Sequence, residues 1–145
     1  MKKPGNWTIE GLFIGRTAAY RLFNIVRAYI ESLGSIMVEA AKTQVSFGVN
    51  PNIKFAWVWL PQMWIKKQKE NSITIEFDLD HEVQHTRIKN AVEPRPGRWT
   101  HHVVVEKESD FNSIIKLWPR QAHELAQTRA LIKTNQRDSL NSRLF

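Results

Sequence analysis

The chain has 145 residues, of which 42% are hydrophobic and 10% aromatic, so its composition is that of one folded domain and not that of a disordered chain. It has no cysteine, which excludes a disulfide framework and a thiolate metal site and fits a reducing compartment. Twenty-one Lys and Arg residues against fourteen Asp and Glu give a net charge of +7, which favours polyanionic partners such as nucleic acid.

The N-terminal stretch MKKPGNWTIEG has two lysines but no apolar segment behind them, so we expect no secretory signal. No stretch of the sequence approaches the roughly 18 consecutive apolar residues that a membrane span requires. We therefore expect a cytoplasmic protein without a membrane partner, and no pattern in the sequence indicates an oligomeric state.

The first predicted element is an amphipathic helix over residues 16–33. Its apolar residues recur at spacings of three and four, which places them on one side of a helix, while the polar residues fall elsewhere. Thr17 is a suitable N-cap, and Gly34 follows where a left-handed residue commonly ends a helix. A short helical turn is expected before it, between Trp7 and Phe13.

The middle of the chain predicts five strands. The first begins at Ile36, the second spans 45–49, the third is KFAWVWL (54–60), the fourth is SITIEFDL (72–79), and the fifth covers roughly 100–107. In the fourth, apolar and polar residues alternate, which is typical of one buried and one solvated face. Both faces of the third are apolar, which favours a central strand, and Trp57 within it either fills the core or lines a ligand groove.

The predicted connection between the fourth and fifth strands is long. Residues 81–99 are mostly polar, and Pro94, Pro96 and Gly97 interrupt them. A connection of this length is often functional, although plain irregular structure accounts for it equally well. The pattern predicts no strand there.

A second helix is predicted from Asp110 onward, capped by Ser109 or Asp110. Pro119 lies inside its apolar stripe, and an interior proline removes a backbone donor and clashes with the preceding turn. We therefore expect either a kink or two abutting helices, with Pro119 near the start of the second.

This order of elements predicts an α+β domain. We expect a single domain over residues 1–133, followed by a polar C-terminal tail over residues 134–145. Five mainly antiparallel strands would form the sheet, with the N-terminal and C-terminal helices packed on one of its faces.

Several segments together resemble a known family. The segments AKTQVSF (41–47), FAWVWLP (55–61) and TRIKNAVEPRPGRWTHHVVV (86–105), with W..QA from Trp118, are similar to the uncharacterised family catalogued as domain of unknown function 5655. The resemblance spans roughly residues 13–131. It implies a compact α+β domain, found alone or at the end of longer bacterial proteins, some of which carry restriction-nuclease-like partners. It carries over no catalytic residue, because no activity is established for the family.

The residues that match this family's pattern are Lys42, Gln44, Trp57, Arg87, Arg98, Trp99, His101 and His102. Three positions depart from it: Asn112 stands where an acid is usual, Pro119 where an aliphatic residue is usual, and His123 where an aromatic is usual. These departures bear on the geometry of the C-terminal helix more than on the sheet.

Four histidines lie within or just after the predicted connection: His81, His85, His101 and His102. Adjacent strand residues point to opposite faces, so His101 and His102 do not readily chelate one ion together. The sequence contains no HExxH or comparable metal spacing, no nucleophile motif and no glycine-rich phosphate loop. A buried, hydrogen-bonded histidine is the commoner case, and we predict no metal site, no cofactor and no catalytic residue.

The stretch GRWTHH (97–102) joins a cation, a large aromatic ring and two imidazoles. We expect Trp99 to pack at the sheet edge, one of the two histidines to point inward to a hydrogen bond, and Arg98 to face solvent or a ligand. This combination favours a binding surface over a reaction centre.

The leading hypothesis is a non-catalytic binding module for an anionic partner, with nucleic acid as the first candidate. Its candidate ligand-binding residues are Lys42, Trp57, Arg87, Lys89, Arg95, Arg98, Trp99, His101 and His102. The cations among them are expected to share one face with an exposed aromatic residue. One alternative is a small-ligand or metal-dependent enzyme, which predicts a pocket with a carboxylate near His101 or His102. The other is a protein-interaction module built on an exposed Trp-rich strand.

Overall fold

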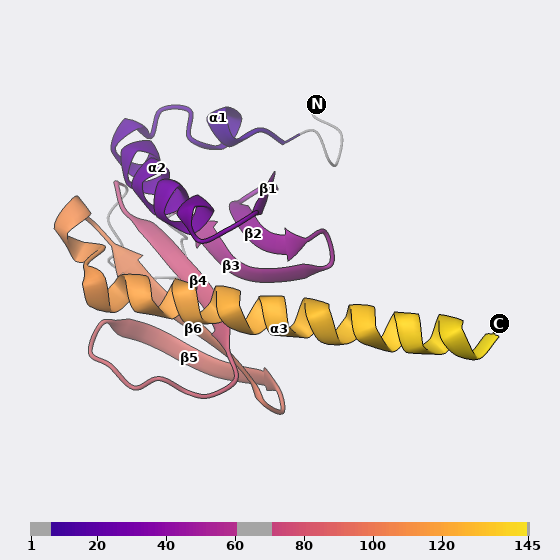
Figure 1. Ribbon diagram of the computed structural model, residues 1–145. Coiled ribbons are helices and arrows are strands. Elements are labelled where there is room, and N and C mark those ends of the chain that lie inside the picture. Colours follow the sequence, from indigo (N-terminus) through magenta and orange to yellow (C-terminus); the bar gives the residue numbers. More distant parts are fainter. Residues whose placement is uncertain (1–6, 61–70, 145) are drawn as a thin grey trace.

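The computed structural model describes residues 7–60 and 71–144 (Figure 1). It confirms the α+β class, because an antiparallel sheet carries the two long helices on one face. In chain order the elements are α1 (Ile9–Leu12), α2 (Thr17–Ser32), β1 (Met37–Ala40), β2 (Gln44–Asn50), β3 (Ile53–Trp59), β4 (Ile73–Leu79), β5 (Ile88–Arg95), β6 (Arg98–Val105), η1 (Glu108–Asp110) and α3 (Ser113–Leu144). Within these described residues, no helix combines the length and the apolar character that crossing a bilayer requires.

The sheet has six strands in the order β1-β2-β3-β4-β6-β5, and each of these neighbouring pairs is antiparallel. Residues 80–87 carry the chain from β4 past β6 to the far edge, where β5 begins. The two edges of the sheet are therefore β1 and β5, which Figure 1 shows on opposite sides of the molecule.

The strand that the sequence did not predict is β5. Its polar residues and Pro94 indicated an irregular connection, yet an edge strand bonds to one neighbour only and so tolerates a residue without a backbone N–H. Pro96 and Gly97 form the two-residue turn into β6, whose ends Arg95 and Arg98 are paired. Gly97 has a φ of 75°, the left-handed conformation that a turn with proline at its first central position favours at the second.

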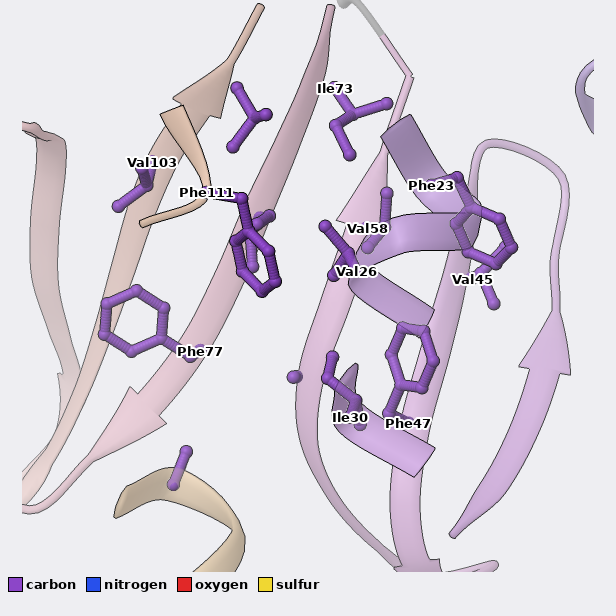
Figure 2. Packing of buried hydrophobic residues seen from close by; sticks show 14 of the residues in the cluster. Phe23, Val26, Ile30, Val45, Phe47, Val58, Ile73, Phe77, Val103 and Phe111 are labelled. Carbon is purple, nitrogen blue, oxygen red and sulfur yellow. The ribbon is translucent and has the colours of Figure 1, made fainter. Parts of the chain in front are cut away.

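One half of the helix-bearing face lies under α2. Its buried residues follow the predicted spacing and are Ala19, Leu22, Phe23, Val26 and Ile30. Figure 2 shows α2 laying its apolar side against β2 and β3, with Phe23, Val26 and Ile30 close to the strand residues. The rings of Phe23 and Phe47 have centroids 6.3 Å apart, so aromatic packing joins this helix to β2.

The two ends of α2 differ from the prediction. Arg16, and not Thr17, is the N-cap, and it makes no side-chain capping bond. At the other end, the N–H of Leu33 bonds to the carbonyl of Ile30 and tightens the last turn. Gly34 is consequently not left-handed, because the tightened turn already satisfies that carbonyl.

The helix α3 is continuous through Pro119, so the expectation of two abutting helices is wrong. Trp118 and Ala122, on either side of the proline, are both buried against the rest of the fold. This packing outweighs the one backbone hydrogen bond that a proline removes. The helix also begins later than predicted: the side-chain oxygen of Asn112 accepts hydrogen bonds from the N–H groups of Ile114 and Ile115, each at 3.1 Å.

At two of the three positions that depart from the family pattern, the residue present does what the usual residue would do: Asn112 caps a helix, and His123 packs as an aromatic ring. Asn112 caps α3 with an oxygen acceptor, which an acidic residue also supplies. His123 is buried, and its ring meets Phe55 edge to face with centroids 5.2 Å apart, so it packs as an aromatic residue would.

The second half of α3 leaves the sheet. Ala126 is the last residue of the buried core, and residues 131–140 are all exposed. Figure 1 shows this half projecting well beyond the strands. The segment predicted as a polar tail therefore continues the helix as far as Leu144.

Candidate functional site

The pairing register assigns the strand side chains to two faces. Val58 and Ile75 are partners within the core beneath the helices. Their chain neighbours Trp57 and Glu76 are also partners, and His102 pairs with Glu76 in turn. Because successive side chains alternate, Trp57, Glu76 and His102 form a row on the face opposite α2 and α3.

A hydrogen-bonded cluster lies in the middle of that opposite face. The Nε1–H of Trp59 donates to Oε1 of Glu76 at 3.1 Å, and Nε2 of His102 lies 2.9 Å from the same oxygen. The side chains of His102 and Glu76 are only 13% and 15% exposed. A carboxylate between an indole and an imidazole fixes the orientation of the histidine, which is an arrangement suited to proton transfer.

The two tryptophans of β3 do not fill the space between the sheet and the helices. Trp57 and Trp59 are both partly exposed, and neither belongs to the buried core cluster. They lie on the face opposite the helices, whereas their neighbours Ala56 and Val58 supply the core contacts. Of the two roles considered for Trp57, the core role is therefore wrong.

His101 points into the core on the helix-bearing side. Its side chain is fully buried and stacks on Phe77, with ring centroids 5.0 Å apart. Its Nε2 accepts a hydrogen bond from the backbone N–H of Val83 at 2.9 Å, which ties the 80–87 connection to the sheet. Burial lowers the pKa of His101 below its usual 6.5, so the ring is neutral at physiological pH.

Lowering the pH is expected to destabilise the fold through His101. The unfolded chain takes up a proton near pH 6.5, whereas the folded chain resists protonation because burial lowers the pKa of this histidine. The contribution of neutral His101 is therefore complete above that pH and decreases as the pH falls toward the folded-state pKa. Urea unfolding at about pH 7.5 and about pH 5.5 measures the decrease.

His101→Gln is the matched variant for this measurement, since an amide oxygen can accept the Val83 hydrogen bond and takes up no proton. Its stability is expected to change less between the two pH values than that of the unaltered chain. Burial also lowers the pKa of His123, but this effect is common to both proteins and cancels in the comparison. Equal pH dependence in the two proteins would show that His101 does not titrate on unfolding.

The predicted ligand-binding cations do not all share one face. Lys42 lies in the turn between β1 and β2, at one edge of the sheet, whereas Arg95 and Arg98 flank the turn between β5 and β6 at the other edge. Lys89 is exposed on β5. Lys42 is thus separated from the other candidates by the width of the sheet.

Arg87 is held within the fold. Its Nη2–H donates to the carbonyl of Val104 at 2.9 Å, and the same nitrogen lies 3.7 Å from a carboxylate oxygen of Asp110. These contacts tie the start of β5 to β6 and to η1. The structure therefore gives Arg87 a positioning role within the chain.

One cation of the β5–β6 turn, Arg98, approaches α3. Arg98 lies close enough to Arg129 of α3 for the two positive charges to repel each other, and Figure 1 shows the turn beside the middle of that helix. Residues spaced by four share one side of a helix, so Lys133 and Arg137 extend the line outward from Arg129. We call this set the basic strip: Arg95, Arg98, Arg129, Lys133 and Arg137.

Three members of the basic strip are not among the residues that the sequence predicts. Arg129, Lys133 and Arg137 recur at intervals of four, which was the available signal, but residues from 134 onward were assigned to a tail. Only the continuation of α3 beyond the sheet places them on one side of a helix.

Arg129 has two hydrogen-bond donors without an acceptor. Its Nε and Nη2 are both buried, and no described residue offers either one a hydrogen-bond partner. Burial lowers the pKa of its guanidinium, and the charge of Arg98 lowers it further. Two like charges placed together around unsatisfied donors are typical of a site that takes an anion.

Two carboxylates lie near Arg129, and both have other partners. The hydroxyl of Thr100 donates to Oδ1 of Asp78 at 2.8 Å, and Oδ1 of Asp80 lies 2.7 Å from Nδ1 of His81. Burial raises the pKa of Asp78, because it disfavours the charged form of this carboxyl group. Neither acid accepts a hydrogen bond from the two buried donors of Arg129.

Trp99 lies on the side of the sheet that α3 covers. It follows Arg98 and pairs across the strands with Leu79, a core residue, so it lies on the helix-bearing face. It is partly exposed and does not belong to the core cluster. Its strand β6 is interior to the sheet, so the predicted packing at a sheet edge is wrong.

A hollow of about 270 Å³ lies away from the histidines, at the β1 side of the sheet. Its lining residues are Met37, Val38, Glu39, Ser46, Gly48, Asn50, Pro51 and Lys54. Lys54 pairs with Glu39 across it at 3.4 Å. Across residues 7–60 and 71–144, no group of three or more His, Asp or Glu side chains is arranged to hold a metal ion.

One family profile matches most of the chain. The family is described as Domain of unknown function (DUF5655), and its profile covers residues 9–126. This match confirms the resemblance seen in the sequence and includes the sheet, α2 and the packed part of α3. The α3 members of the basic strip lie beyond it. No curated protein and no solved structure matches the chain.

Proposed function

We propose that this chain, which belongs to the DUF5655 family, is a non-catalytic binding module for an anionic partner, and that the partner is nucleic acid. The observation that carries the proposal is the basic strip, where Arg98 and Arg129 lie together and two donors of Arg129 have no acceptor among the described residues. Buried donors without an acceptor raise the free energy of the unliganded protein, and a bound anion would supply the missing acceptors.

The length of the strip suits a phosphate chain. Arg129 and Arg137 are eight residues apart, which corresponds to about 12 Å along a helix. A strand that runs along this side of the helix meets three cations in succession, Arg129, Lys133 and Arg137, so the strip can contact several phosphates of one strand. Between residues 130 and 140 of the sequence the only acidic residue is Asp138, so the projecting half of α3 keeps an excess of positive charge.

Removing exposed charges from the strip is expected to reduce the salt dependence of binding. The double variant Lys133→Gln, Arg137→Gln changes two exposed side chains on the part of α3 that leaves the sheet, so it should not alter the fold. On a single-stranded oligonucleotide, the slope of log affinity against log salt should fall by about 0.7 for each phosphate that the variant no longer binds. Fluorescence anisotropy of a labelled oligonucleotide over a salt series measures this slope.

The control for this experiment removes the same charge elsewhere. Lys42→Gln with Arg21→Gln changes two exposed cations, one in the β1–β2 turn and one on α2. Arg21 is exposed, and its ion pair with Glu108 is long, at 3.9 Å, so its removal should barely affect stability. The control slope should equal that of the unaltered chain. Equal slopes in all three proteins, or no salt-dependent binding to DNA or RNA at all, would refute the proposal.

A second candidate function, acid–base chemistry on a small ligand, is favoured by the 2.9 Å contact between His102 and Glu76. Its test is a nuclear magnetic resonance titration of the His102 ring with a panel of small carboxylic acids, sugars and nucleosides. Saturable shifts that Glu76→Gln abolishes would support this candidate, whereas shifts confined to the basic strip would exclude it.

A further inference from the structure

We infer that the basic strip selects single-stranded over duplex nucleic acid, holding a phosphate on the guanidinium of Arg129 and a base against Trp99. This inference rests on the proposed function and specifies the class of partner. It depends on two features of the site: which donors of Arg129 are unsatisfied, and where Trp99 lies.

The unsatisfied donors of Arg129 form one edge of its guanidinium. Nε–H and Nη2–H point the same way and make the two-pronged arrangement that binds two oxygens of one phosphate or carboxylate. Both nitrogens are buried, and neither has an acceptor among the described residues. An arginine side chain is long and flexible, and these unsatisfied donors favour its turning outward to meet an anion.

Trp99 supplies the feature that distinguishes the two forms of nucleic acid. It lies on the helix-bearing face, where α3, the helix that carries Arg129, packs, and it is partly exposed and outside the core. An aromatic ring beside phosphate-binding cations stacks on a base whose face is free. In a duplex the base faces are covered by stacked neighbours, so only an unpaired base can meet this ring.

A duplex would use different parts of the molecule. The projecting half of α3 has the width of a helix that enters a major groove, and its exposed Lys133 and Arg137 would then contact backbone phosphates. That mode leaves Trp99 and the two-pronged edge of Arg129 without a role. The site therefore favours the single strand, and tighter binding of the duplex is the outcome that opposes the inference.

The experiment compares a labelled single strand with a hairpin duplex of the same sequence, at fixed salt. We expect the single strand to bind more tightly and to quench the intrinsic tryptophan fluorescence of the protein. Trp99→Leu should weaken single-strand binding by roughly tenfold and remove most of the quenching. Trp7→Leu, which changes a partly exposed tryptophan in the segment before α1, is the matched control and should leave both unchanged.

Arg129→Lys tests the phosphate contact separately, because it keeps the charge and removes the two-pronged edge. Single-strand affinity should fall by about tenfold while the salt slope stays unchanged. Thermal melting shows that each variant is folded. Equal or tighter binding of the duplex, with no effect of Trp99→Leu, overturns the inference but keeps the proposed function. Absence of salt-dependent binding to either probe overturns both.

Discussion

Replacing Phe77 with alanine is expected to lower the free energy of unfolding by about 3–5 kcal/mol. Phe77 is fully buried in β4 and contacts a ring on either side: His101 of β6 at 5.0 Å and Trp118 of α3 at 5.6 Å between centroids. Its side chain therefore joins the sheet to the C-terminal helix. Truncation removes both stacking contacts and leaves a cavity that the surrounding backbone cannot close. Equilibrium unfolding in urea measures the decrease.

Two control variants show whether the lost buried volume of Phe77 causes the decrease in stability. Phe77→Leu retains most of the buried volume and should cost less than about 1.5 kcal/mol. Val92→Ala, at an exposed position of β5, should change the free energy of unfolding by less than about 0.5 kcal/mol. If Phe77→Ala were as mild as Val92→Ala, the packing of α3 on β4 would not be the main support of the fold.

Gly48→Ala is expected to destabilise the protein by about 1–3 kcal/mol. A methyl group at this position would lie 2.8 Å from the carbonyl oxygen of Ile53 and 2.9 Å from that of Asn50. Both neighbours are backbone atoms at the irregular pairing between β2 and β3, so the strands must shift to make room. The backbone conformation itself is one that alanine can adopt, so crowding alone causes the effect.

Gly34→Ala is the control for crowding. Its added methyl group would meet only the ring of His123, at 3.3 Å, and a side chain can move where two carbonyl groups cannot. The decrease in stability should therefore be clearly smaller than for Gly48→Ala, as measured by the urea midpoint at constant slope. Equal decreases would mean that the β2–β3 irregularity adapts freely.

Patterns that repeat along the chain predicted their elements correctly. The three-and-four spacing of α2 and the alternation along β4 are repeated over many residues, and both elements appear where they were expected. The misses concern β5 and the continuity of α3, and each involves a proline. Whether a proline interrupts an element depends on the neighbouring elements, because an edge position tolerates it and tertiary packing offsets it.

The candidate site was only partly predictable for a related reason. Strand alternation alone separated His101 from His102, and the structure places them on opposite faces. The meeting of Arg98 with Arg129 joins positions 31 residues apart and depends on where α3 crosses the sheet. Arg87 and Lys42 matched the family pattern as well as Arg98 did. The sequence does not reveal that Arg87 donates to the backbone carbonyl of Val104, or that Lys42 lies at the opposite edge of the sheet.

The open edges of the sheet bear on how this protein behaves when concentrated. An unprotected edge strand invites a strand from a second molecule, and repetition of that pairing leads to aggregates. At one edge, β5 carries Pro94, which offers no N–H, amid the charged side chains of Lys89, Glu93 and Arg95. At the other, β1 is only four residues long. Both edges therefore resist intermolecular strand pairing. Pro94, because of which β5 was not predicted from the sequence, also helps to keep the folded chain from polymerising.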